Sequence, residues 1–307
     1  MEELFLFPTA VTELNTPLET IPTGVVSIRA PEVWDVSRKG EGIVIAVIDS
    51  GVDVDHPDLK DNIIGGFNFT NDDNGNEDAY FDYKGHGTHV AGIIAASENS
   101  QGIIGIAPKA KLLILKVLNK NGIGKVTALI DAIEYAINWR GKNNEKVQVI
   151  NLSLGSAKES IELRNVIKKA NKKGIVLVGS SGNHGDSNSE TNEMLFPNFY
   201  KEVIQVGAVD LENKISKFSN SNPNLDFVAP GENVISTYIG QSYSSMSGTS
   251  MAAPHATGSV ALILNMLTNT NLNFNLTPAV VYSHLLIHAI SLGFSPNDEG
   301  NGFIQLI

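Results

Sequence analysis

Residues 43–51 read Ile-Val-Ile-Ala-Val-Ile-Asp-Ser-Gly, an apolar run that ends in an acidic side chain and a glycine. A short run rich in β-branched residues is typical of a strand buried on both faces of a sheet. Its last residues carry Asp49 to a turn marked by Gly51. Active sites of open parallel sheets gather at the carboxyl ends of the strands, so Asp49 lies where chemistry is expected. Taken alone, an Asp that caps the next element is the simpler interpretation.

The rest of the chain repeats this alternation of short buried strands with helical patterns. The predicted strands are residues 42–48, 111–118, 147–154, 175–178 and 203–209. The predicted helices are residues 89–96, 126–139, 161–172, 250–267 and 278–290. Strands that alternate with helices in this way predict an α/β fold with a mainly parallel central sheet between helical layers.

Composition narrows the function classes. The 307 residues include 22 Lys and Arg against 33 Asp and Glu, a formal net charge of −11, and no Cys. Disulfide scaffolds, iron–sulfur clusters and cysteine nucleophiles are therefore excluded, and the negative charge argues against a nucleic-acid partner. The amino terminus is acidic and its apolar run stops at Pro8, so no secretory signal is recognised. No apolar run approaches the ~20 residues of a membrane span, and we expect a cytoplasmic protein with no membrane partner.

Two further motifs carry chemistry-bearing side chains at the expected starts of helices. Residues 85–92 read Gly-His-Gly-Thr-His-Val-Ala-Gly, so His86 lies between two glycines, which permit close approach of another backbone. Residues 248–255 read Gly-Thr-Ser-Met-Ala-Ala-Pro-His and place Ser250 at a helix N-terminus, where free amides favour an anion. A structural His and a simple helix cap are the alternative interpretations of these two motifs.

A fourth motif offers an amide donor. Residues 175–183 read Ile-Val-Leu-Val-Gly-Ser-Ser-Gly-Asn, a strand that runs into a Gly-bounded Asn. The side chain of Asn183 is suited to donate to a developing oxyanion, although Gly-Asn is also a common turn pair.

Together these motifs resemble the signature motifs of subtilisin-like serine proteases, the subtilases, over about residues 25–307. The resemblance rests on the order Asp, His, Ser and above all on residues 248–255. It implies a three-layer α/β fold and hydrolysis of peptide bonds through an acyl-enzyme. It implies that Ser250 is the nucleophile, His86 the base, Asp49 the residue that orients His86, and Asn183 an oxyanion donor.

The resemblance also implies where a peptide substrate binds. An extended peptide would lie as an added strand between Gly122 and Gly124 on one side and Ser153, Leu154 and Gly155 on the other. One wall of the first side-chain pocket would be formed by the residues that follow the strand at 175–178, namely Gly179, Ser180, Ser181 and Gly182. Leu195 is expected near the floor of this pocket, so large P1 side chains should be disfavoured.

Two segments resemble a structural calcium site of secreted subtilisins. Residues 56–59 and 97–103 would supply oxygen ligands, which suit Ca²⁺. The implied ligands are the side chains of Asp58 and Asn99 and the carbonyls of Ser97, Gln101 and Ile103. Residues 71–82 are also acidic, but they lack the spacing of an EF-hand and are expected to form a solvated loop.

Residues 1–23 differ from the rest because they contain Pro8, Pro17 and Pro22, and composition alone predicts a flexible arm before a catalytic domain at 24–307. The chain most resembles the intracellular subtilisins of bacilli, whose short arm carries a Leu-Ile-Pro-Tyr/Phe motif that blocks the cleft. Here the motif reads Leu6-Phe7-Pro8-Thr9, with Thr9 in place of the final aromatic. Proline lacks an N–H and has a fixed φ, which would keep the nearby peptide bond out of reactive geometry.

Three functions remain open on the sequence. The first is an intracellular serine endopeptidase made as a short-arm zymogen, which acts on peptides or unfolded proteins and which family habit makes a homodimer. The second is a cytoplasmic leader peptidase for a ribosomal peptide of the lantibiotic type. The third is a catalytically inactive peptide-binding scaffold, which is disfavoured because Asp49, His86, Asn183 and Ser250 are all present.

Overall fold

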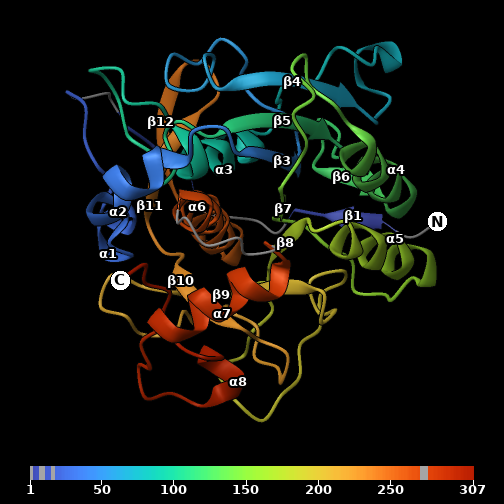
Figure 1. The fold of residues 1–307 in the computed structure, drawn as a ribbon. Helices are drawn as coiled ribbons and strands as arrows, with labels where there is room; N and C mark the ends of the chain where they lie inside the picture. The colour runs from blue at the N-terminus through green and yellow to red at the C-terminus, as the bar shows by residue number, and fades with distance from the viewer. Residues whose placement is uncertain (1–2, 7–10, 15–17, 270–275) are drawn as a thin grey trace.

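The computed structural model describes residues 3–6, 11–14, 18–269 and 276–307. Its centre is a parallel sheet of seven strands, in the spatial order β10-β9-β8-β7-β3-β5-β4 (Figure 1). In that order their bounds are Phe227–Pro230, Val203–Val209, Val176–Ser180, Val149–Leu152, Val44–Asp49, Lys111–Lys116 and Ile63–Asn68. From β3 the sheet grows in both directions, so the order of the strands reverses beside Asp49.

Two hydrophobic cores lie on opposite faces of this sheet. Side chains of a strand alternate between its faces, and in β3 Ile45 and Val47 join one core while Val44, Ala46 and Ile48 join the other. Helices α3 (His86–Ala95) and α6 (Thr249–Asn269) cover the first face. Helices α4 (Val126–Asn138) and α5 (Ile161–Lys172) cover the second, as Figure 1 shows. The fold is therefore the three-layer α/β arrangement that the sequence predicts.

Shorter elements complete the described structure. Around the first core lie α1 (Thr23–Ser27), α2 (Ala30–Ser37), α7 (Pro278–His288) and α8 (Pro296–Glu299). Single 3₁₀ turns cover Arg38–Gly40 and Asp72–Gly75. Because α1 begins at Thr23, the expected boundary after residue 23 falls inside a helix.

Two small antiparallel sheets involve the amino-terminal arm. Strand β1 (Glu3–Phe5) pairs with β6 (Ile123–Lys125), and β2 (Val11–Leu14) adds to β12 (Ser242–Met246), which also pairs with β11 (Val234–Tyr238). Composition alone favours a flexible arm, whereas Glu3–Phe5 and Val11–Leu14 are paired in sheets. The difference arises because an extended segment can form hydrogen bonds with the edge of a folded strand. Amino-acid composition gives no information about such an edge.

Other departures from the sequence-based elements are small. Helix α3 begins at His86 and not at residue 89, because Gly85 adopts a left-handed φ of 81° and serves as its N-cap. Strands β4, β10, β11 and β12 were not predicted. Strand β4 contains two glycines, which weaken a strand pattern.

Candidate active site

The side chains of Asp49 and His86 meet at the carboxyl end of the sheet. Asp49 ends β3 and His86 begins α3, and both are buried. Nδ1 of His86 lies 2.8 Å from Oδ1 of Asp49. The glycines around His86 permit this approach, since a Cβ on Gly87 would lie 2.2 Å from the carbonyl oxygen of Gly51. Among the described residues, Nε2 of His86 and Oδ2 of Asp49 are buried and have no hydrogen-bond partner.

Ser250 is the second residue of α6 and is buried near the end of β7, the strand next to β3. Its Oγ donates to the carbonyl oxygen of Ser153 at 3.2 Å. In return, Oγ of Ser153 donates to the carbonyl oxygen of Ser250 at 3.0 Å. The hydroxyl group of Ser250 is therefore held toward the segment after β7, and a rotation about χ1 would redirect it.

Asn183 lies in the loop after β8, and Thr249 fixes the orientation of its amide group. Oδ1 of Asn183 accepts hydrogen bonds from the backbone N–H of Thr249 at 2.9 Å and from its hydroxyl group at 2.7 Å. With the oxygen engaged in this way, Nδ2 remains available as a donor. The sequence identified Asn183 but treated Thr249 only as a helix cap.

The environment of His86 shifts its affinity for a proton. Burial disfavours the charged imidazolium, but the charge of Asp49, its hydrogen bond and the more distant charge of Asp82 outweigh burial. The pKa of His86 is therefore raised above the ordinary value of 6.5. The imidazolium that forms when His86 gains a proton is stabilised by the carboxylate of Asp49.

Asp82 is a buried carboxylate that holds the start of α3 in place. Its Oδ1 accepts from the hydroxyl group of Ser50 at 2.9 Å and from the backbone N–H of Gly85 at 2.9 Å. Its Oδ2 accepts from the N–H of Thr88 at 2.9 Å and from its hydroxyl group at 2.7 Å. The expectation that residues 71–82 form a solvated loop is thus wrong for Asp82, which is fully buried. An Asp a few residues before a helix is a capping signal that could have identified it.

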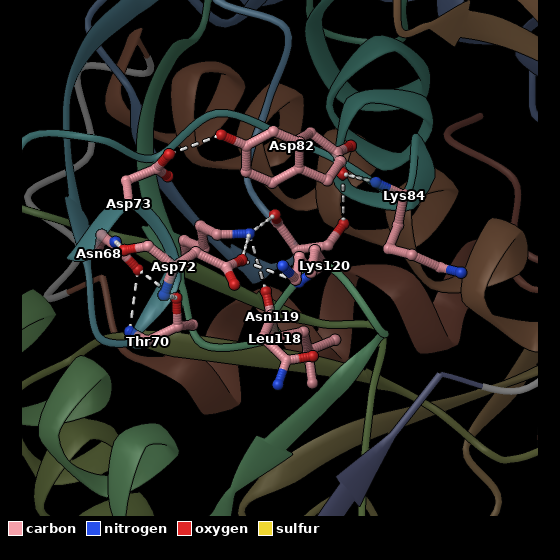
Figure 2. Close-up of polar contacts among 12 residues, drawn as sticks. Asn68, Thr70, Asp72, Asp73, Asp82, Lys84, Leu118, Asn119 and Lys120 are labelled. Atoms are coloured by element: carbon pink, nitrogen blue, oxygen red, sulfur yellow. Dashed lines mark hydrogen bonds and ion pairs between the residues drawn. The ribbon is translucent and has the colours of Figure 1, made fainter. Parts of the chain in front are cut away.

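Lys116 is a fully buried lysine at the end of β5. Its ammonium group donates to the carbonyl oxygens of Ser50 at 2.7 Å and Leu118 at 2.9 Å, and lies 3.2 Å from Oδ2 of Asp72. The same carboxylate oxygen accepts from the N–H of Lys120 at 2.8 Å (Figure 2). This cluster joins the turn after Asp49 to the segment that leads into β6.

The predicted substrate strands face each other, and the arm lies between them. The N–H of Phe5 donates to the carbonyl oxygen of Gly155 at 3.3 Å, and that of Leu6 donates to Gly122 at 3.2 Å. Leu4 is opposite Gly124 in β1–β6 pairing, and its side chain is fully buried. Of the predicted inhibitory motif, Leu6 is described, whereas Phe7, Pro8 and Thr9 lie outside the described residues.

A residue that the sequence did not single out joins the predicted pocket wall to one of the predicted substrate strands. Nδ2 of Asn198 donates to the carbonyl oxygens of Ser180 in the wall at 2.8 Å and Leu154 in the strand at 3.0 Å. Leu195 is 2% exposed, and a Cβ on Gly155 would lie 2.5 Å from its Cγ. The Leu195 side chain therefore packs directly against the substrate strand at Gly155. The predicted wall comprises Gly179, Ser180, Ser181 and Gly182, all of them buried.

The predicted calcium ligands come together around Asp58, which is fully buried. Its carboxylate accepts from Nδ2 of Asn99 at 3.1 Å and from the N–H of Ile103 at 3.0 Å. Oε1 of Glu19 accepts from the N–H of Asn99 at 2.6 Å and of Ser100 at 2.7 Å, so the arm contributes a carboxylate to this loop. In the part of the chain that the structure describes, no group of three or more His, Cys, Asp or Glu is placed to hold a metal. The other predicted ligands are carbonyl and amide oxygens.

Comparison with known proteins gives relatives over nearly the whole chain. The pattern of the Subtilase family matches residues 40–303. An "Intracellular serine protease" of Paenibacillus polymyxa is 46% identical over 304 residues, covering 99% of this chain and 91% of that protein. The "Major intracellular serine protease" of Bacillus subtilis (strain 168) is 43% identical over 305 residues, covering 99% and 93%. "Subtilisin DY" of Bacillus licheniformis is 40% identical over 247 residues, covering 80% and 85%.

A parallel α/β sheet with a buried Asp–His pair at its carboxyl end fits a serine hydrolase. With the Subtilase pattern matched over residues 40–303, the chain belongs to the Subtilase family. It is a subtilisin-like serine endopeptidase, similar to the intracellular serine proteases of Paenibacillus and Bacillus. Within the described ranges, no helix is both long and apolar enough to cross a lipid bilayer.

Proposed function

We propose that Asp49, His86 and Ser250 hydrolyse peptide bonds through an acyl-enzyme. The observation that carries this proposal is the 2.8 Å contact between His86 Nδ1 and Asp49 Oδ1, which leaves Nε2 as the free, buried nitrogen. Ser250 attacks the carbonyl carbon while Nε2 of His86 takes its proton, and His86 then gives that proton to the departing amine. Water repeats the sequence on the acyl-enzyme and restores the Ser250 hydroxyl group.

The negative charge of each tetrahedral intermediate lies at the N-terminus of α6. The donors proposed for it are Nδ2 of Asn183 and the backbone N–H of Ser250. Thr249 supports this assignment because it engages the oxygen of the Asn183 amide and so leaves the nitrogen as the group that donates. Donors fixed in advance cost no reorganisation when the charge develops, which is why they lower the barrier.

A serine-directed fluorophosphonate and an unfolded protein test the chemistry together. We expect the probe to label Ser250, labelling to vanish in Ser250→Ala, and the arm-free protein to digest casein. Labelling without casein digestion, but with cleavage of one leader peptide, would favour the dedicated leader peptidase. Absence of any adduct would contradict the proposal and favour a peptide-binding scaffold.

We infer that the arm makes the chain a zymogen, with residues 1–18 as a removable inhibitor. Residues 3–6 use the hydrogen-bonding groups of Gly122, Gly124 and Gly155 that a substrate strand would use. A segment tethered to the same chain is present at high effective concentration, so even modest contacts keep the cleft occupied.

The inhibition is tested by comparing full-length protein with a chain that begins at Glu19, using a chromogenic peptide. We expect the shortened chain to be at least about tenfold faster, because the tethered competitor is gone. A thermal melt of both chains controls for folding. Equal rates in two folded chains would remove the arm from the mechanism.

We propose that small P1 side chains are preferred. The Leu195 side chain packs against Gly155 and fills space at the base of the predicted pocket. Leu195→Gly should therefore raise kcat/KM for a P1 Phe substrate relative to a P1 Ala substrate. If the ratio of kcat/KM for P1 Phe to that for P1 Ala does not change, Leu195 does not determine P1 specificity.

We propose that the loop around Asp58 binds Ca²⁺. The residues fit this ion because their donors are all oxygens: the carboxylates of Asp58 and Glu19, the amide oxygen of Asn99, and the carbonyls of Ser97, Gln101 and Ile103. A bound ion would cross-link the loop to the segment before α1. Thermal unfolding with Ca²⁺ and with a chelator tests this, with Glu19→Gln expected to reduce the difference between the two midpoints.

The proposed setting is the cytoplasm, on the strength of the two relatives named intracellular. A homodimer is the proposed assembly, and light scattering after size exclusion would test it. Peptides and unfolded proteins are the proposed substrates, with no nucleic acid and no membrane among the partners.

A further inference from the structure

The arm contacts the molecule on a second edge, which the substrate strands do not include. Residues Val11–Leu14 form β2, and its register sets Val11 opposite Met246, Thr12 opposite Ser245 and Leu14 opposite Tyr243. The sheet order is β11-β12-β2, so without β2 the strand β12 would be an edge strand. An open edge presents unpaired N–H and C=O groups that accept another extended chain.

Strand β12 is fixed by the folded body and does not depend on the arm for its shape. It pairs along its whole length with β11, from Val234 opposite Met246 to Tyr238 opposite Ser242. The Tyr243 hydroxyl group donates to Asp58 at 2.9 Å, and His89 Nε2 lies 3.1 Å from the carbonyl oxygen of Ser244. The edge is therefore preformed, which lowers the entropic cost of binding an extended peptide.

The two strands of the arm pair with segments that adjoin Ser250. Strand β1 ends beside Gly155, two residues after Ser153, whose carbonyl oxygen accepts from Ser250 Oγ. Strand β2 begins beside Met246, four residues before Ser250. Five peptide links separate Leu6 from Val11, so the two strands are joined by a segment that reaches at most about 17 Å.

We propose that the free edge of β12, residues 243–246, is the docking strand for the part of a substrate that follows the scissile bond. The inference rests on the proposed function, in which β1 occupies the place of residues that precede that bond. Strand β2 then occupies the place of residues that follow it, in the same chain direction. The arm thus traces a substrate path over both sides of Ser250.

The chemistry of β12 indicates the class of ligand. Its sequence, Ser-Tyr-Ser-Ser-Met, carries no charge, and Tyr243, Ser244 and Met246 are buried. Backbone hydrogen bonds therefore supply most of the recognition, with little selection of side chains. The ligand is an extended polypeptide with at least four residues beyond the cleaved bond, as in unfolded protein and not in a short peptide.

The test uses the full chain with its two arm strands disabled separately. Leu4→Glu places a charge at a fully buried position and so releases β1. Thr12→Pro with Glu13→Pro removes two successive N–H groups. In an antiparallel ladder successive residues face opposite sides, so one of the two must face β12. Thr12→Ala with Glu13→Ala is the matched control, because it trims the same side chains and keeps both N–H groups.

Two substrates share the same residues before the scissile bond. One ends in p-nitroanilide and the other continues for eight residues to a quencher, as many as follow Leu6 to the end of β2. Both double variants, proline and alanine, are combined with Leu4→Glu. For the long substrate, we expect kcat/KM of the proline variant to be at least about tenfold higher than that of the alanine variant. For the p-nitroanilide the two should differ less than about twofold.

Equal ratios on both substrates would overturn the docking strand while leaving the proposed function intact. Failure of every variant to cleave either substrate would overturn both. A second measurement uses the double proline chain and long substrates with a single N-methyl group at successive positions after the scissile bond. We expect losses of about tenfold at alternate positions only, since each lost hydrogen bond weakens binding by about that factor. Equal losses at neighbouring positions would refute strand pairing.

Discussion

Two clusters of buried charge stand side by side at the carboxyl end of the sheet, and they differ in how their atoms are used. In the first, His86 and Asp49 share one contact, and among described residues Nε2 and Oδ2 have no partner. In the second, both oxygens of Asp82 accept hydrogen bonds, and the Lys116 ammonium group contacts two carbonyls and a carboxylate. Both clusters are buried, so burial does not separate them.

The difference indicates that the first cluster serves the reaction and that the second stabilises the backbone around it. A buried polar atom without a partner costs free energy, and such atoms are retained where a reacting group will complete them. A fully partnered charge instead fixes backbone, here the turn after Asp49 and the start of α3. Substitutions in the first cluster should therefore lower kcat with little change in the free energy of unfolding. Substitutions in the second cluster should mainly lower the free energy of unfolding.

Removal of the nucleophile is the largest expected effect. Ser250→Ala should reduce kcat by about 10⁶-fold, the loss that removal of this hydroxyl group causes in a subtilisin. His86→Ala should cost as much, and the double variant little more, because the groups act as a unit. Hydrolysis of a long peptide by the arm-free chain measures the rates, and thermal melts should stay close to the parent. Undiminished hydrolysis by Ser250→Ala would remove this site from the chemistry.

The oxyanion donor comes next. Asn183→Leu should lower kcat by about 10²–10³-fold with little change in KM, as loss of such an Asn does in a subtilisin. Thr249→Val should give a smaller fall in kcat, because it frees the Asn183 amide to turn without removing it. A change confined to KM in either variant would assign these residues to substrate binding.

The supporting cluster is tested through Lys116. Lys116→Met leaves the Ser50 and Leu118 carbonyls and the Asp72 carboxylate without their buried donor, and should lower the free energy of unfolding by about 3–5 kcal/mol. Chemical denaturation measures the loss. The double variant Lys116→Met with Asp72→Asn should recover part of it, since the unpaired charge is gone. Full additivity would show that the ion pair carries no coupling.

The contrast between the two clusters also explains what sequence could predict. Asp49, His86 and Ser250 stand out because each ends a buried run or opens a helix beside glycines, which are local signals. Asp82 and Lys116 were missed because their partners come from distant segments, and an acidic loop or a Lys at a strand end is typical of solvent exposure. The Lys within an apolar strand was nevertheless a signal, since such a residue is buried only when it is paired.

The arm shows the same limit. Its proline content predicts a flexible segment, and the resemblance to intracellular subtilisins predicts a blocked cleft. Neither predicts that Val11–Leu14 pairs with β12 or that Glu19 contacts the loop around Asp58. These contacts depend on edges and N–H groups that exist only after the domain has folded.

The smallest expected effect is a shift in pH dependence. Imidazolium cannot accept the proton of Ser250, so kcat/KM should fall as pH drops through the pKa of His86, which Asp49 and Asp82 raise above 6.5. Asp82→Asn removes one of these charges and should move the acid limb to lower pH. Ser50→Ala breaks a hydrogen bond to Asp82 but keeps its charge, so its limb should stay in place. Matching shifts in both variants would mean that Asp82 acts on His86 through position and not through charge.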